Sequence, residues 1–446
     1  MTEGPFFKKM LLFAVPIVIT GLLQCFYNAA DLVVVGQFRG DLAVAAVGST
    51  GALTNLIIGL FMGLSVGAGV SVAHYIGAKE PEEIKKTVHT SILLSVICGI
   101  IIAIVGFFLS KEMLVLMDTP AEVLPLATLY LKIIFIGVPA SIVYNYAASM
   151  IRSTGDSRRP LIFLAISGVV NVGLNLLLIT AFNMGVDGVA IATITSQYLS
   201  AAMAIVYLTK TSGVLRLTFR DLRLHGDKVR KIFRIGIPSG IQGTLFSLSN
   251  VLIQSAINSF GDIVVAGSAA SASLEGFLYI AMNSMYHVAL TFVGQNVGAK
   301  KFKNIKRVTI YSAIMVTIIG MLGGAILLIF RYPLISLYVT SNSAMDAATQ
   351  RMWIIATLYF MCGLMDVFCG VLRGLDRSVT SMIISLIGAC GLRIVWIQTV
   401  FRWFPSPQTV YFSYPVTWII TLSAHIIFVI IVTNKLLRNQ QAELQA

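Results

Sequence analysis

The chain has 446 residues, of which 57% are hydrophobic and only 11% are charged, and its mean hydropathy is +0.87. Soluble domains carry about 25% charged residues, so the composition excludes a soluble enzyme or binding module. The formal net charge of +13 would suit a nucleic-acid-binding protein, but most of this charge lies in short connections between apolar runs. The composition indicates an integral membrane protein that binds no nucleic acid.

The apolar runs are each about 20 to 25 residues long, which matches helices that cross a hydrocarbon core of about 30 Å and exceeds the length of barrel strands. We therefore expect an all-α integral membrane protein with twelve transmembrane helices. The runs are centred near residues 22, 62, 98, 137, 171, 200, 244, 283, 319, 361, 390 and 424.

The basic residues predict the orientation of these helices. If the N-terminus is cytoplasmic, 25 of the 32 Lys and Arg residues fall on the inside and five on the outside. Cytoplasmic connections of membrane proteins carry an excess of Lys and Arg. We expect a multi-pass protein of the plasma (inner) membrane with both termini in the cytoplasm.

The two halves of the chain resemble each other. A shift of 221 or 222 residues aligns Pro16 with Pro238, Asn28 with Asn250, Gly40-Asp41 with Gly261-Asp262, Gly77-Ala78-Lys79 with Gly298-Ala299-Lys300, and Arg152 with Arg373. Six spans in each repeat give both copies the same orientation, a plan known from secondary transporters. We expect two six-helix lobes, residues 1–210 and 231–446, related by a pseudo-two-fold axis along the membrane normal and joined by a cytoplasmic linker at 211–230.

The first span carries a polar stripe. Gln24, Asn28 and Asp31 fall on one side of a helix. An ionised carboxylate in a bilayer costs about 2.5 to 3.5 kcal/mol on insertion scales, so such an acid usually faces a cavity, an ion path or a partner. Pro16 removes one backbone hydrogen bond in the same span and acts either as a hinge or as a static kink.

Other spans of the first half also carry polar side chains. Asn171 and Asn175 share a helix face, and so do Thr193 and Gln197. Each alone could simply join helices by hydrogen bonds. Together with Asp31, their oxygens could bind a proton or a sodium ion. The fourth span adds Tyr144 and Asn145.

The second half differs, because Ile253 stands where Asp31 would repeat. Glu275 and Arg393 should lie at a similar depth and form an ion pair, with either a structural or gating role or a role in substrate contact. Asp366 lies nearer the cytoplasmic side and is expected to pair with Arg373, two helical turns along the same face.

No phosphate-binding loop, paired-His zinc motif or nucleophile elbow occurs in the sequence. We therefore expect no enzymatic activity and no cofactor. The energy for transport would come from an ion gradient.

Together these motifs resemble the multidrug and toxic compound extrusion (MATE) family of cation-coupled antiporters. The resemblance covers nearly the whole chain. It rests on Pro16, Gln24, Tyr27-Asn28, Asp31, Val35-Gly36, Gly77-Ala78-Lys79, Arg152, Gly155-Asp156-Ser157, Pro160, Asn171, Asn175, Gly188 and Ala192-Thr193.

The resemblance implies a monomeric antiporter in membrane lipid that exports amphiphilic organic cations or drugs by alternating access, in exchange for protons or sodium. Asp31 matches the coupling acid of the family, Pro16 its helix bend, and Asn171, Asn175 and Thr193 its oxygen ligands for a cation such as sodium. The expected residues of the substrate site or cavity are Gln24, Tyr27, Asn28, Tyr144, Asn145, Gln197, Glu275 and Arg393.

Two alternatives stay open from the sequence. A lipid-linked saccharide flippase of the same superfamily would need several cationic side chains in its cavity. A non-transporting scaffold or a channel belongs to another class, and a scaffold would not need a buried acid with polar neighbours. Transport driven by an ion gradient would separate these alternatives from the antiporter.

Overall fold

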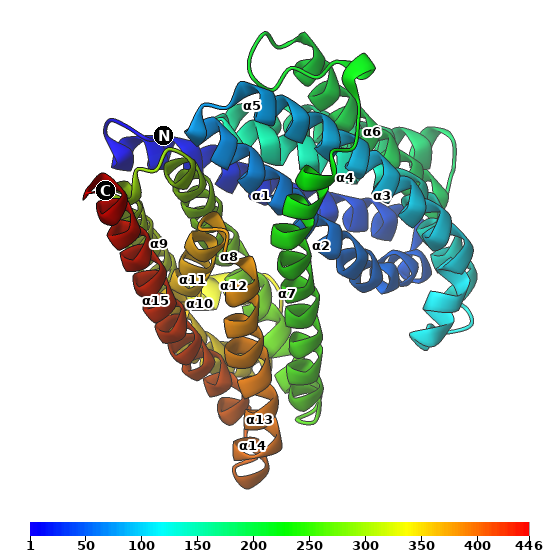
Figure 1. The fold of residues 1–446 in the computed structure, drawn as a ribbon. Coiled ribbons are helices and arrows are strands. Elements are labelled where there is room, and N and C mark those ends of the chain that lie inside the picture. Colours follow the sequence, from blue (N-terminus) through cyan, green and yellow to red (C-terminus); the bar gives the residue numbers. More distant parts are fainter. Residues whose placement is uncertain (446) are drawn as a thin grey trace. The chain divides into compact units, whose positions relative to one another are not determined.

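A computed structural model describes residues 1–445, and that part of the chain forms helices and turns without a β-strand (Figure 1). The first half contains α1 (Phe6–Arg39), α2 (Asp41–Ala78), α3 (Pro81–Leu116), α4 (Leu124–Ser153), α5 (Arg158–Leu176), the π-helical turn η1 (Leu177–Ala181) and α6 (Val186–Lys210). The linker contains the 3-10 turn η2 (Phe219–Asp221). The second half contains α7 (Gly226–Asn258), α8 (Asp262–Gly298), α9 (Phe302–Ile329), α10 (Arg331–Ile335), α11 (Asn342–Gly374), α12 (Ser378–Ser385), the π-helical turn η3 (Leu386–Gly391), α13 (Leu392–Gln398), α14 (Val400–Trp403) and α15 (Pro407–Gln445).

Eleven helical segments among the described residues are long and apolar enough to cross a membrane, the run from α12 to α14 counting as one. The twelfth expected span is α7, whose 33 residues suffice in length. It begins with a charged segment and carries polar side chains such as Gln242, Asn250 and Gln254, so its hydropathy is lower. The all-α fold with twelve long helical segments is confirmed.

The chain forms two compact units, and each division falls inside a long helix. One unit is Val15–Gly240, and the other consists of Met1–Ala14 together with Ile241–Ala446. The divisions lie next to Pro16 in α1 and Pro238 in α7, the prolines that the repeat aligns. The first segment of each of these helices therefore packs in the unit built mainly from the other repeat. The lobe boundaries expected at residues 210 and 231 stay a prediction.

The backbone repeats as well as the sequence. Gly40 precedes α2 with φ 76°, and Gly261 precedes α8 with φ 87°. Glycine adopts this left-handed region without the steric cost that a Cβ atom brings. Lys79 and Lys300, which follow α2 and α8, also share a left-handed conformation, with φ 59° and 53°. The aligned sequence motifs thus mark the same turns in both halves.

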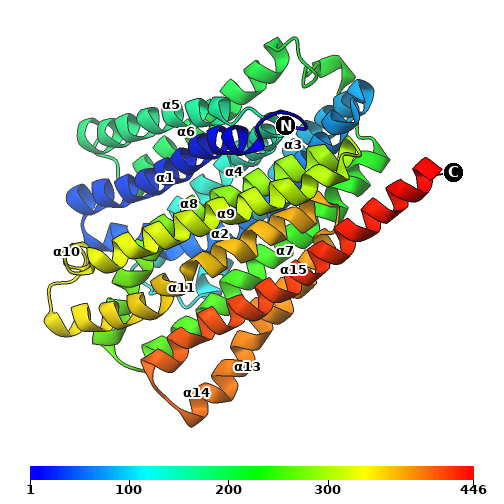
Figure 2. The ribbon, with the colours of Figure 1, turned by 90° about the vertical axis from the view of Figure 1, so that its left-hand side faces the viewer.

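Within each unit one helix is central. In Val15–Gly240, α4 packs against α2, α3 and α6. The same unit has a close crossing of α2 and α7, where a Cβ atom on Gly63 would lie 2.2 Å from the backbone nitrogen of Gly240. In the other unit α11 packs against α8, α9 and α15, and Figure 2 shows the axes of α9, α11 and α15 lying roughly parallel to one another.

Candidate functional site

Asp31 is buried in α1 and held by side chains from two other helices of its unit. The Asn175 amide of α5 donates a hydrogen bond of 2.5 Å to one carboxylate oxygen. The Thr193 hydroxyl of α6 donates one of 3.2 Å to the other oxygen. Among the described residues, no Lys, Arg or His forms an ion pair with Asp31. The carboxylate is therefore held by neutral donors.

Asn171 completes this cluster. Its carbonyl oxygen lies 3.4 Å from the Asn175 amide nitrogen, one turn along α5. Asn175 is fully buried, and its own carbonyl oxygen has no hydrogen-bond partner among the described residues. The π-helical turn η1 begins directly after this helix. π-Helical turns often lie at functional sites because they change the direction of the side chains around them.

Tyr130 is a neighbour that the sequence did not reveal. It is buried in α4 and lies within electrostatic range of Asp31. A single tyrosine in an apolar span carries no pattern that distinguishes it from a packing residue. Its helix α4 packs against α6, which supplies Thr193 to the same carboxylate.

The cluster suits a small cation or a proton. It presents carboxylate, amide and hydroxyl oxygens, which are the ligands that hard cations prefer. The buried carbonyl oxygen of Asn175 has no partner, and a half-turn of the Asn175 side-chain amide would bring this oxygen toward Asp31. In that orientation it could accept a hydrogen bond from a protonated Asp31 or bind a cation beside it.

Three residues expected in the cavity lie close to backbone carbonyl groups, and their place in a cavity stays a prediction. Tyr27 fills the space above Gly168, and its hydroxyl lies 3.4 Å from the carbonyl oxygens of Leu164 and Ala165. The Tyr144 hydroxyl donates to the carbonyl of Pro160 at 2.8 Å. The Asn145 amide donates to the carbonyl of Ser141 in its own helix. The two tyrosines thus link α1 to α5 and α4 to the start of α5.

The other polar residues expected in the first half form no hydrogen bond with Asp31 within residues 1–445. Gln24 and Asn28 are exposed, and no hydrogen bond of their side chains occurs within residues 1–445. The carbonyl oxygen of Gln197 is buried without a hydrogen-bond partner in the described chain and lies near Gly137. Pro16 lies inside α1, which continues through it.

The expected pair of Glu275 with Arg393 is wrong. Glu275 is buried in α8 and forms a bidentate ion pair with Arg351 of α11. The Arg351 guanidinium donates to the two carboxylate oxygens at 3.1 and 2.8 Å. Ser271 donates a further hydrogen bond of 2.7 Å to the same carboxylate. Arg351 is one of the five basic residues that the charge pattern places outside the membrane. Helix α11 begins at Asn342, so Arg351 lies well inside it and faces α8.

Arg393 has neutral neighbours instead. Its guanidinium contacts the Thr417 hydroxyl at 3.2 Å and the Asn250 carbonyl oxygen at 3.4 Å, and lies 4.4 Å from the centre of the Tyr414 ring. A cation over an aromatic face is attracted by the electrons of the ring. Each half has a π-helical turn beside one of these buried polar residues. Arg393 lies two residues after the end of η3, and Asn175 lies two residues before the start of η1.

Asp366 and Arg373 do not form the expected ion pair. Asp366 accepts a hydrogen bond of 3.3 Å from Asn283. Arg373 donates to the Tyr286 hydroxyl and, at 2.8 Å, to the carbonyl oxygen of Gln242. Seven residues advance a helix by about 10 Å, so partners on neighbouring helices are closer than a residue two turns away.

Comparison with known proteins finds one family in both halves of the chain. The MatE family model matches residues 16–177 and again residues 238–398. The two matches begin at Pro16 and Pro238, the prolines that the internal repeat aligns.

Relatives of the full length are also found. The chain is 26% identical over 394 residues to the probable multidrug resistance protein YoeA of Bacillus subtilis, covering 87% of this chain and 85% of the relative. It is 28% identical over 395 residues to the probable multidrug resistance protein YpnP of the same organism, covering 88% of each. A solved outward-facing multidrug resistance MATE family transporter shares the fold, with a TM-score of 0.91, 20% identity and 98% of each chain covered.

Proposed function

This chain belongs to the MatE family of membrane transporters, and we propose that it is an antiporter that exports amphiphilic organic cations in exchange for protons or sodium ions. The observation that carries the proposal is the buried Asp31 carboxylate, which neutral donors hold without a cationic partner among the described residues. Intramembrane acids of this kind are costly and commonly belong to ion or proton pathways.

Because no fixed counter-ion lies beside Asp31 among the described residues, the group would have two accessible charge states. When Asp31 is ionised, the Asn175 amide nitrogen and the Thr193 hydroxyl donate to it. When a proton binds, the carboxylic acid becomes a donor, and the carbonyl oxygen of Asn175 is the available acceptor after a half-turn of the amide. A sodium ion would use the same oxygens.

Helix α1 links this chemistry to a conformational change. Asp31 contacts α5 and α6 in the unit Val15–Gly240, whereas the first residues of α1 belong to the other unit. A change in how α5 and α6 hold Asp31 would act on α1, and Pro16 lies where the helix passes from one unit to the other. A ligand shifts such an equilibrium by its difference in affinity for the two states.

We propose drug-like substrates because the named relatives are multidrug resistance proteins, and cationic ones because the Asp31 carboxylate has no cationic partner among the described residues. An amphiphilic cation would bind through apolar and aromatic contacts and compete with the coupling ion for the charge of Asp31. The sequence counts of 25 Phe and 17 Met are compatible with such a surface.

The test is efflux of ethidium from proteoliposomes under an imposed proton gradient and, separately, a sodium gradient. We expect one gradient to drive efflux by the wild type and Asp31→Asn to abolish the response. Asp262→Asn is the matched control, since Asp262 is an exposed acid at the start of α8. The proposal fails if the wild type moves no cation under either gradient, or if Asp31→Asn responds like the wild type.

A further inference from the structure

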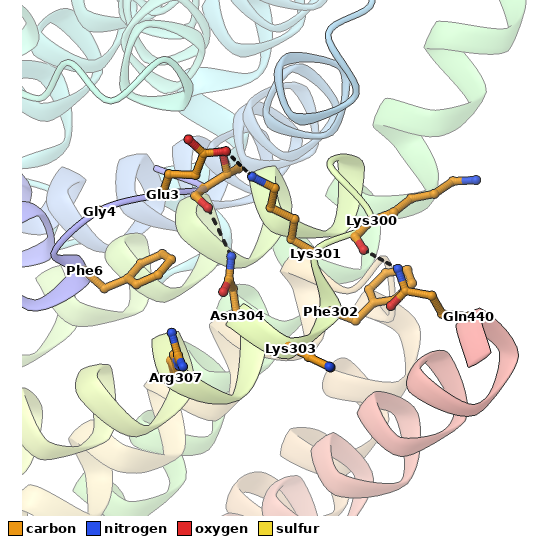
Figure 3. Close-up of a pocket in the computed structure, with 11 residues that line it drawn as sticks. Glu3, Gly4, Phe6, Lys300, Lys301, Phe302, Lys303, Asn304, Arg307 and Gln440 are labelled. Atoms are coloured by element: carbon orange, nitrogen blue, oxygen red, sulfur yellow. Dashed lines mark hydrogen bonds and ion pairs between the residues drawn. The ribbon is translucent and has the colours of Figure 1, made fainter. Parts of the chain in front are cut away.

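A pocket of about 570 Å³ lies between the N-terminal segment before α1 and the turn that connects α8 to α9 (Figure 3). All of its lining residues belong to the unit that contains Met1–Ala14 and Ile241–Ala446. Because α8 and α9 are both long and apolar enough to span a membrane, the pocket lies at the membrane boundary.

The pocket is strongly basic. Its lining includes Lys300, Lys301, Lys303 and Arg307, and Glu3 is the one acid among the eleven lining residues. Glu3 forms an ion pair with Lys301. Lys300, Lys303 and Arg307 are exposed, and none of them forms an ion pair within residues 1–445. The pocket therefore carries uncompensated positive charge.

Two of these cations repel each other. Lys303 and Arg307 lie four residues apart on α9 and so occupy the same helix face. Like charges at this spacing destabilise a helix. An anion bound between them would remove the repulsion, and Phe6 and Phe302 add apolar surface to the same pocket.

Hydrogen bonds hold the N-terminal segment beside the turn between α8 and α9. The Asn304 amide donates to the carbonyl of Thr2 at 3.1 Å, and the Asn296 amide approaches the carbonyl of Met1 at 3.4 Å. On the other side, Gln440 of α15 donates to the carbonyl of Lys300 at 2.7 Å. The residues that line this open pocket thus come from three separate segments of the chain (Figure 3).

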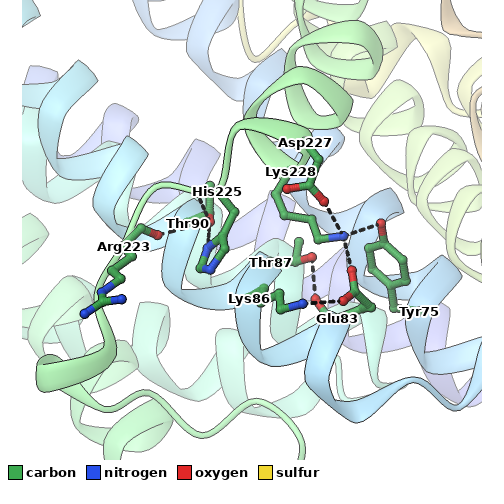
Figure 4. A network of polar contacts seen from close by, with 9 residues as sticks. All are labelled: Tyr75, Glu83, Lys86, Thr87, Thr90, Arg223, His225, Asp227 and Lys228. Carbon is green, nitrogen blue, oxygen red and sulfur yellow. Dashed lines mark hydrogen bonds and ion pairs between the residues drawn. The ribbon is translucent and has the colours of Figure 1, made fainter.

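The equivalent turn of the first repeat has the opposite polarity. There the start of α3 supplies an acid, Glu83, and the start of α7 supplies the cation, Lys228 (Figure 4). Lys228 is also bonded to the Tyr75 hydroxyl at 2.9 Å and to Asp227 at 2.9 Å. In the second repeat the acid comes from the leading segment and the cation from the turn, as Glu3 and Lys301 show.

The difference in charge between the two turns is not a requirement of the fold. Both turns adopt the same left-handed backbone after Gly-Ala. Residues 77–86 hold three basic and three acidic residues, whereas residues 298–307 hold five basic residues and no acid. Orientation in the membrane would be satisfied by a smaller excess of positive charge. The concentration of cations around a pocket therefore indicates a ligand.

We propose that this pocket binds the phosphate group of an anionic phosphate ester. Lys303, Arg307 and Lys300 would supply the charge, and Phe6 and Phe302 would contact the part of the ligand next to the phosphate. An anionic phospholipid headgroup and a soluble phosphate ester present the same chemistry. Clusters of basic residues beside membrane helices bind anionic lipid headgroups in this way.

The experiment measures binding to the full-length protein in an uncharged detergent. The probes are dioctanoyl phosphatidylglycerol, dioctanoyl phosphatidylcholine and glycerol 3-phosphate, titrated below the concentration at which the lipids form micelles. We expect saturable binding of the phosphatidylglycerol and weakening by at least about tenfold in the triple variant Lys300→Gln, Lys303→Gln, Arg307→Gln.

Two further variants make the result specific. The triple variant Lys79→Gln, Lys85→Gln, Lys86→Gln removes the same charge from the turn of the first repeat and should bind within about twofold of the wild type. Glu3→Gln removes the one acid of the pocket lining and should tighten binding several-fold. Because Glu3→Gln acts in the opposite direction, it tests the proposal even if the first triple variant fails to fold.

Each outcome decides the question. Tight binding of the phosphatidylglycerol alone identifies a lipid headgroup, and equal binding of glycerol 3-phosphate identifies a soluble phosphate ester. The proposal is overturned if neither anionic probe binds saturably, if the zwitterionic lipid binds as tightly as the anionic one, or if the pocket variants bind like the wild type. The inference does not depend on the transport activity proposed above.

Discussion

The two halves of the chain each bury an acid, but they surround it differently. Asp31 in the first half is held by an amide and a hydroxyl. Glu275 in the second half forms a bidentate ion pair with Arg351 and accepts a hydrogen bond from Ser271. Removing the charge of Asp31 leaves no buried cation behind, whereas removing that of Glu275 leaves a guanidinium without its partner. The first carboxylate has only neutral donors beside it among the described residues, and the second has a fixed counter-charge.

The largest expected effect is on Glu275. Glu275→Gln should lower the free energy of unfolding by about 3 to 5 kcal/mol, because Arg351 stays buried without its counter-charge. Replacing both members, with Glu275→Leu and Arg351→Met, should recover most of the loss. The measurement is unfolding of the purified protein in detergent. If Glu275→Gln is as stable as the wild type, the two buried acids do not differ in the way described here.

A packing change in the first half should have a smaller effect. A Cβ atom on Gly63 would meet the backbone of Gly240, which cannot move aside as a side chain can, so Gly63→Ala should cost about 1 to 3 kcal/mol. Gly243→Ala on α7 is the control, since no atom lies within 4 Å of its added Cβ. Equal stability of the two variants would contradict the close crossing. A lower free energy of unfolding in Gly63→Ala alone would show that the close approach of α2 and α7 limits the size of the residue at this position.

Asp31→Asn should change stability by less than about 1 kcal/mol, since an amide of the same shape keeps hydrogen bonds to Asn175 and Thr193. The same variant should lose ion-driven efflux. Melting temperatures in detergent, measured beside the transport assay, separate the two effects. A loss of stability as large as that of Glu275→Gln would mean that Asp31 is a structural residue.

The smallest effect is expected for an exposed pair. Lys85 contacts Asp221 at 2.7 Å, and both side chains are nearly half exposed. The hydrogen bond and charge of Lys85 lower the pKa of Asp221, so this contribution is present at neutral pH and lost when acid protonates Asp221. Because water screens the pair, Lys85→Gln should leave the melting temperature at pH 7 unchanged. A clear decrease of the melting temperature would show that loss of an ion pair destabilises the protein even where both side chains are exposed to water.

Much of the architecture follows from the sequence alone. Apolar runs of membrane-spanning length predict the helices, and the aligned prolines, glycines and lysines predict two repeats. The resemblance to the MATE family, drawn from the same residues, is confirmed by the family match in both halves. Asp31, Asn171, Asn175 and Thr193 could be grouped in advance, because polar residues inside apolar spans are few and helical periodicity shows which of them share a face.

The partners of most other polar residues depend on tertiary structure. Glu275 meets Arg351 because α8 packs against α11, and depth along separate helices does not reveal which helices are neighbours. Tyr130 lies near Asp31 for a similar reason. The basic pocket exists because the segment before α1 packs beside the turn between α8 and α9, nearly 300 residues away in the chain. Periodicity determines the faces of single helices, and only their packing decides which faces meet.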